Sequence, residues 1–144
     1  MHIPGLVIKR GILMLTKEEF QQKIQEGVRI LDGATGSNLR AAGMPKDCCT
    51  EQWVLENPEP LVTLQRAYAA AGSQIIYANP FGANARKLAP TGHGVEEVVT
   101  QAVRIARKAA EGTDTLVAVD MGPLGELLEP MGSLSFEEAY NLFR

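Results

Sequence analysis

The chain has 144 residues, of which 45% are hydrophobic and 22% are charged, a mixture that is typical of one soluble globular domain. Its net charge of −3 argues against nucleic acid as a partner, and no apolar run reaches the roughly 20 residues that a membrane-spanning helix needs. Residues 1–13 contain no signal-peptide core and no helical pattern, so we expect a disordered leader, a folded domain over residues 14–144 and a cytoplasmic protein.

The first well-specified element begins at Thr16. Thr16 and Glu19 fit a capping box, in which each side chain accepts a hydrogen bond from the backbone N–H of the other residue. The sequence therefore predicts a helix that runs to about Glu26 and ends at Gly27, since glycine favours helix C-termini. Residues 28–31, which are apolar except for Arg29, then predict the first strand.

The second helix is predicted to begin at Pro58, because proline is favoured at the first helical position. Leu61, Leu64 and Tyr68 lie on one face of this helix at helical spacing. Residues 74–78 follow as the second strand, a nearly continuous apolar run of the kind that is buried on both faces.

The third helix begins at Val95, carries apolar residues with a period of 3.6, and ends at Gly112. Residues 116–119 predict the third strand, and a second capping box over residues 135–138 begins a last helix. Strands that alternate with amphipathic helices predict an α/β fold, in which right-handed crossovers join the strands of a parallel sheet.

Each predicted strand ends in small and polar residues. These are Asp32-Gly33-Ala34-Thr35-Gly36, Asn79-Pro80-Phe81-Gly82-Ala83 and Asp120-Met121-Gly122-Pro123-Leu124-Gly125. In parallel α/β folds, ligands bind at the carboxyl ends of the strands. Asp32-Gly33-Ala34 suits the zwitterionic end of an amino acid, because a carboxylate can hold the ammonium group while backbone N–H groups hold the carboxylate.

Other interpretations of these residues stay open or drop out. An Asp-Gly pair after a strand is also the usual form of a turn or of an N-cap, so Asp32 has two possible roles. The dinucleotide motif G-x-G-x-x-G and the phosphate-binding motif G-x-x-x-x-G-K-[ST] are both absent. Cys48 and Cys49 are adjacent, which disfavours a disulfide between them, and two thiols alone do not make a tetrahedral zinc site.

Several segments resemble the homocysteine S-methyltransferase family, in order and at the expected spacings, over about residues 15–144. They are LDGATGSNLRAAG, Cys49-Thr50-Glu51, NPEPLVTLQRAYAAAGSQIIYANPFGANARKL, DMGPLGELLEP and LSFEEAY. Within the family the likeness is greatest to the homocysteine-binding barrel at the start of cobalamin-dependent methionine synthase. The resemblance implies a (β/α)8 TIM barrel, of which this chain is the N-terminal part with about three strand–helix units.

The resemblance also implies a function. The parent protein is expected to be a zinc-dependent methyltransferase that makes methionine by methyl transfer to the homocysteine thiolate. Methylcobalamin is a candidate methyl donor, and betaine or S-methylmethionine serves in relatives. The substrate-binding residues implied are Asp32, Gly33, Ala34, Asn79, Gly122 and Pro123. No catalytic residue and no metal ligand is implied in this chain, because the zinc cysteines of the family lie near later strands.

A barrel of this kind needs roughly 250 residues, so we expect the chain to be a fragment that is truncated at its C-terminal end. Its expected partners are homocysteine and the missing C-terminal half of the barrel or a completing chain. The alternative is a non-catalytic fragment or binding subunit without a zinc site. The sequence leaves open whether the chain alone is an enzyme, which methyl donor serves, and the oligomeric state.

Overall fold

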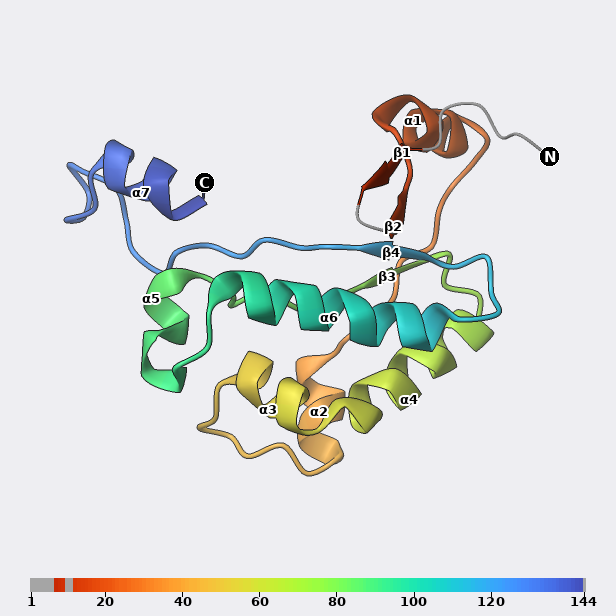
Figure 1. The fold of residues 1–144 in the computed structure, drawn as a ribbon, viewed down its shortest axis with the longest axis horizontal. Helices are drawn as coiled ribbons and strands as arrows, with labels where there is room; N and C mark the ends of the chain where they lie inside the picture. The colour runs from red at the N-terminus through yellow and green to blue at the C-terminus, as the bar shows by residue number, and fades with distance from the viewer. Residues whose placement is uncertain (1–6, 10–11, 144) are drawn as a thin grey trace. The chain divides into compact units, whose positions relative to one another are not determined.

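The computed structural model describes residues 7–9 and 12–143, and it divides into two units, residues 1–30 and 31–144 (Figure 1). In the first unit, strands β1 (Val7–Lys9) and β2 (Ile12–Met14) pair antiparallel. The predicted leader overlaps this hairpin, and its residues 1–6, 10 and 11 lie outside the described part.

Helix α1 (Lys17–Gln25) begins as the capping box predicts. The N–H of Glu19 donates to Thr16 Oγ1 at 3.2 Å, and the N–H of Thr16 donates to Glu19 Oε2 at 2.7 Å. The helix ends before Gly27, which has a φ of 152° that an L side chain rarely adopts. None of the residues of α1 is buried, so this helix contributes nothing to a hydrophobic core.

The strand predicted over residues 28–31 is not formed, and only Leu31 makes a parallel bridge, to Ile75. The side chains of Val28 and Ile30 are 90% and 59% exposed. These exposed side chains give the segment no buried face, and a strand is stabilised by burying one face of consecutive residues.

The sheet of the second unit consists of β3 (Ile75–Tyr77) and β4 (Leu116–Ala118), which pair in parallel with Ile75 opposite Leu116. This confirms the parallel pairing of the second and third predicted strands. Since Ile75 also bridges Leu31, the Leu31 segment lies on the opposite side of β3 from β4. The carboxyl ends of the Leu31 segment, β3 and β4 therefore lie side by side, along one edge of the sheet.

Helices α4 (Pro58–Ala70) and α6 (Val95–Ala110) pack against the sheet and against each other, α4 on β3 and α6 on β4 (Figure 1). Both helices are confirmed close to their predicted limits. Alanines on one face of α6 permit this close approach because they are small. The buried cluster that results comprises Val62, Ile76, Ala78, Ala102, Ala106 and Ala109.

Two shorter helices, α2 (Gly36–Ala41) and α3 (Thr50–Glu56), were not predicted from the sequence. They pack onto α4 through a second buried cluster of Leu39, Met44, Val54 and Leu61. Their shortness explains the omission, because six or seven residues span two turns at most and give little periodic signal.

The remaining helices flank the carboxyl ends of the strands. They are α5 (Ala85–Leu88), the 3₁₀ helix η1 (Ala89–Thr91) and α7 (Phe136–Phe143). The capping box predicted for α7 is present, since the N–H of Glu138 donates to Ser135 Oγ at 3.2 Å. No helix in the described part of the chain is long and apolar enough to cross a membrane.

Candidate functional site

Three polar residues follow the three parallel segments at one edge of the sheet. Asp32 comes after Leu31, Asn79 comes shortly after β3, and Asp120 comes shortly after β4. The carboxylate of Asp32 accepts a hydrogen bond from the N–H of Tyr77 at 3.1 Å. The first predicted site residue is therefore joined directly to the strand that leads to Asn79.

Asp32 has a structural role in the turn after Leu31. Its own N–H donates to the carbonyl of Ile75 at 3.0 Å, so Asp32 extends the parallel pairing by one residue. Its Oδ2 atom is the acceptor for Tyr77, which leaves Oδ1 without a hydrogen bond to another described residue. One oxygen thus fixes the turn, and the other is available to a ligand.

The charges of Asp32 and Asp120 are both disfavoured at this edge. Burial raises the pKa of Asp32; the hydrogen bond from Tyr77 opposes that rise, and the negative charge of Asp120 adds to it. Burial likewise raises the pKa of Asp120, and the charge of Glu51 adds to the rise. Oδ1 of Asp120 is buried and has no hydrogen-bond partner among the described residues. A cation placed here would stabilise both carboxylates.

Asn79 is held in an unusual conformation beside these acids. Its φ is +64°, and in the described part of the chain it is the one residue other than glycine with a positive φ. Its Nδ2 atom is buried and has no hydrogen-bond partner there. Backbone strain together with an unpaired donor is a combination that clusters at ligand sites.

The loop that carries Gly33 and Ala34 is fixed by Tyr68 of α4. The Tyr68 hydroxyl donates to the carbonyl of Ala34 at 3.0 Å. A Cβ atom at Gly33 would lie 2.9 Å from the same hydroxyl, so glycine permits the close approach. The N–H groups of Gly33 and Ala34 have no hydrogen-bond partner in the described ranges, which leaves them able to bind an anion.

Gly122 and Pro123 are in contact with the segment that follows β3. The N–H of Gly122 donates to the carbonyl of Phe81 at 3.1 Å, and a Cβ atom at Gly122 would lie 2.1 Å from that oxygen. Lys87 Nζ donates to the carbonyl of Pro123 at 3.1 Å. These contacts explain why small residues stand here, whereas the predicted substrate contacts of Gly122 and Pro123 stay predictions.

Glu51 also lies at this edge of the sheet, and no role was predicted for it from the sequence. It lies in the first turn of α3, and its Oε1 atom accepts a hydrogen bond from the N–H of Gly82 at 2.6 Å. The resemblance had included the segment Cys49-Thr50-Glu51. That segment was the one signal that pointed to Glu51, since nothing in the local pattern shows that it reaches a loop 31 residues away.

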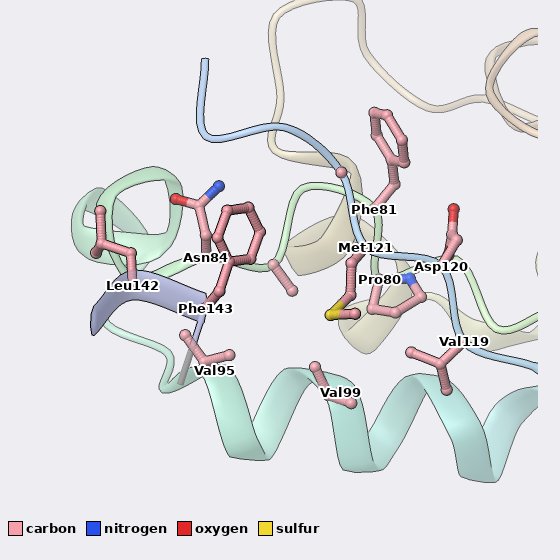
Figure 2. Close-up of a pocket in the computed structure, with 12 residues that line it drawn as sticks. Pro80, Phe81, Asn84, Val95, Val99, Val119, Asp120, Met121, Leu142 and Phe143 are labelled. Atoms are coloured by element: carbon pink, nitrogen blue, oxygen red, sulfur yellow. The ribbon is translucent and has the colours of Figure 1, made fainter. Parts of the chain in front are cut away.

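A cavity of about 140 Å³ adjoins the edge (Figure 2). Val95 and Val99 of α6 point toward it, and Phe81, Met121 and Phe143 line it from three other segments. This lining is largely apolar, so the cavity suits an apolar group better than the charged end of a ligand.

The polar side chains of this cavity are those of Asn84 and Asp120. Asn84 caps α5, because its Oδ1 atom accepts a hydrogen bond from the N–H of Lys87 at 3.0 Å. Its Nδ2 atom is buried and has no partner among the described residues. Asn84 carries little sequence signal, since the helix that it caps has only four residues.

Among the described residues, Cys48, Cys49 and His93 do not gather into a metal site. Cys48 Sγ donates to the carbonyl of Pro45 at 3.2 Å, while Cys49 Sγ donates to Glu51 Oε2 at 3.4 Å. Burial raises the pKa of Cys49, which disfavours the thiolate form that binds metals. His93 is paired with Glu97 at 3.3 Å.

Across residues 7–9 and 12–143, no three His, Cys, Asp or Glu side chains lie together in a way that could hold a metal ion. The residues that the structure describes therefore do not fit the zinc centre that the family resemblance implies. His2 lies outside the described residues.

A family model described as homocysteine S-methyltransferase matches residues 29–144. The metallated form of the homocysteine methyltransferase MmuM from Escherichia coli is 28% identical, with a TM-score of 0.64 over 74% of this chain and 42% of that one. The oxidized form is 24% identical, with a TM-score of 0.62 over 74% and 41%, and supports the fold alone. The chain thus spans less than half of these structures. No curated protein matches it significantly.

Proposed function

Since this chain belongs to the homocysteine S-methyltransferase family, we propose that it supplies the amino-acid-binding edge of an enzyme that methylates the thiol of homocysteine. The observation that carries this proposal is the match to the family model over residues 29–144, which contain all three strand ends. The similarity to MmuM, over 42% of the length of that chain, adds support for the fold and for the type of reaction.

In this proposal the two aspartates bind the ammonium group of homocysteine. One carboxylate oxygen of Asp32 has no hydrogen bond to another described residue, and Asp120 has a buried oxygen without a partner in the described part of the chain. Both pKa values are raised mainly by burial, so a bound cation offsets an unfavourable charge. The N–H groups of Gly33 and Ala34 donate to the substrate carboxylate, and Asn79 Nδ2 is a further donor for it.

Activation of the sulfur is a separate requirement. A free thiol has a pKa of about 8.5, so most of it is protonated at neutral pH. The family resemblance implies zinc for this activation and methylcobalamin as a candidate methyl donor. The described residues contain no donor set for the metal. The contribution of this chain is binding and orientation of the amino acid.

Titration of homocysteine into the 144-residue chain by calorimetry tests the proposal. Asp32→Asn is expected to weaken binding by about ten- to a hundredfold, because a hydrogen bond to a charged group contributes about 1.5–3 kcal/mol. The exposed Asp114 provides a matched control, and Asp114→Asn should bind as the unaltered chain does. 4-Mercaptobutanoate, which lacks the ammonium group, should bind weakly to all three proteins. Equal affinities of the Asp32→Asn variant and the unaltered chain would contradict the proposal.

A second candidate is a unit that binds the amino acid without transferring a methyl group. The donor set favours it, since the described residues offer no group of three metal ligands. An assay that adds zinc and a methyl donor to the 144-residue chain and measures methionine formation distinguishes the two. Methionine formed in proportion to the chain would exclude this candidate, whereas homocysteine binding without methionine formation would favour it.

The same proposal includes two further points: other parts of a barrel complete the sheet, and the protein is cytoplasmic. The first is supported by the 42% coverage of the MmuM structure. The second is supported by composition alone, with a net charge of −3 and 22% charged residues.

A further inference from the structure

We propose that Glu51 is a positioning residue that holds the loops after β3 and β4 in place for the amino-acid substrate. The inference deepens the proposed function and rests on it. Glu51 lies outside both loops and comes from α3, which precedes α4 in the chain. Its carboxylate accepts hydrogen bonds from Gly82 in the loop after β3 and from Cys49 at the start of its own helix, and each contact can be removed by a single substitution.

The central contact is the hydrogen bond from the N–H of Gly82 to Glu51 Oε1, with an N–O distance of 2.6 Å. A bond from a neutral donor to a carboxylate is stronger than one between neutral groups. The other carboxylate oxygen accepts the thiol of Cys49 at 3.4 Å. With both oxygens engaged, the carboxylate has little freedom to turn away from Gly82.

Gly82 lies so close to this carboxylate that a side chain there would have to displace it. A Cβ atom at that position would lie 2.5 Å from Glu51 Oε1 and 2.9 Å from Oε2. The glycine therefore permits the loop to approach α3 closely enough to form the hydrogen bond. An alanine at Gly82 would displace the carboxylate and break the same contact from the other side.

The contact extends to the loop after β4 through Phe81. The carbonyl of Phe81, one residue before Gly82, accepts the N–H of Gly122 at 3.1 Å. Gly122 lies two residues after Asp120, and the charge of Glu51 contributes to the raised pKa of Asp120. The two loops are thus linked to Glu51 through the consecutive residues Phe81 and Gly82.

Packing of helix α3 in the core fixes the position of Glu51. Val54 of the same helix is 3% exposed and belongs to the buried cluster with Leu39, Met44 and Leu61. A side chain on a helix that is held in the core can fix a loop, whereas a loop residue would move with it. Loss of the Glu51 contact should thus free the loops without unfolding α3.

Amide hydrogen exchange, followed by NMR at Gly82 and Gly122, tests the contact without a ligand. Glu51→Ala should raise the exchange rates of both amides by at least about tenfold. It removes the hydrogen-bond acceptor of the Gly82 amide, and it frees the neighbouring Phe81, whose carbonyl accepts the Gly122 amide. Glu51→Gln should keep exchange near that of the unaltered chain, since its amide oxygen can still accept the bond. Glu56→Ala is the matched control, because Glu56 is an exposed residue of the same helix.

Homocysteine titration of the same proteins tests the functional part. Affinity should fall by about tenfold in Glu51→Ala, stay within about threefold in Glu51→Gln, and be unchanged in Glu56→Ala. Gly82→Ala should resemble Glu51→Ala, and the double variant should be no weaker than either single variant. Thermal unfolding of each variant checks that the fold is retained. If Glu51→Ala does not fold, the Gly82→Ala variant tests the same contact.

Unchanged exchange at Gly82 in Glu51→Ala would overturn the inference, and so would an affinity for homocysteine equal to that of the unaltered chain. If the unaltered chain binds no homocysteine while exchange at Gly82 depends on Glu51, the proposed function fails and the loop-holding role stands. The two failures are therefore distinguishable.

Discussion

At the scale of single residues, the raised pKa values of Asp32 and Asp120 have a consequence for pH. Folding raises both above the ordinary value of 3.8, mainly through burial. The charged carboxylates therefore cost stability above the folded pKa values, and this cost disappears as the pH falls below 3.8. Ligand binding depends on pH in the opposite direction from stability, since a bound ammonium group requires the charged form of the carboxylates.

Homocysteine affinity should therefore fall as the pH is lowered through the raised pKa values, beginning at a higher pH than for an ordinary aspartate. Protonation removes the negative charge while the ligand ammonium stays charged. Calorimetric titrations at a series of pH values measure this, and Asp32→Asn should flatten the dependence. An affinity that is constant from neutral pH to pH 4 would contradict the role of the two carboxylates.

Gly122→Ala should destabilise the chain by about 1–3 kcal/mol, because its Cβ atom would lie 2.1 Å from a backbone oxygen that cannot move alone. Urea denaturation measures the change in the free energy of unfolding. Gly36→Ala is the control, since nothing lies within 4 Å of a Cβ atom there. If both variants had the same stability, the contact between Gly122 and Phe81 would be looser than the structure indicates.

At the scale of elements, the pair α4 and α6 holds the sheet whose edge carries the site. Ile76 of β3 is fully buried between them, in the cluster with Val62 and Ala106. The position of each loop at the edge depends on this packing, because the loops continue directly from β3 and β4. The site is thus stabilised mainly by apolar contacts that lie outside it.

Ile76→Ala should lower the free energy of unfolding by about 2–5 kcal/mol, through loss of apolar contacts and creation of a cavity. Chemical denaturation monitored by circular dichroism gives the value. Leu127→Ala is the control, because Leu127 is 65% exposed and should change stability little. A small effect at Ile76 would mean that neighbouring side chains collapse into the space.

At the scale of the whole molecule, the two units have different contents. Every residue of the three buried clusters lies between positions 39 and 142, and no residue of α1 is buried. The second unit therefore contains the hydrophobic core of the described part of the chain. The first unit contains a short hairpin and one helix with a good N-terminal cap.

Deletion of residues 1–13 should leave the unfolding midpoint of the second unit within about 2 °C, because it removes no residue of the buried clusters. Differential scanning calorimetry of the full and shortened chains makes the comparison. A fall of many degrees would show that the leader contributes to the core.

The amino-acid sequence by itself determined the elements whose signals are local. Caps, helical periodicity and glycine endings act over a few residues, and they predicted α1, α4, α6 and the start of α7. The spacing of apolar runs predicted the parallel pairing of β3 and β4. The family resemblance, carried by motifs in order, was confirmed by the match over residues 29–144.

Only the tertiary structure decided which of these residues meet. Asp32 and Tyr77 are 45 positions apart, and Glu51 and Gly82 are 31 apart. Such pairs depend on how α3 and α4 pack against the sheet, which no local pattern encodes. The first predicted strand failed for the same reason. Val28 and Ile30 are apolar and suit a strand, but the tertiary structure leaves their side chains 90% and 59% exposed, and an isolated bridge from Leu31 to Ile75 stands in place of a strand.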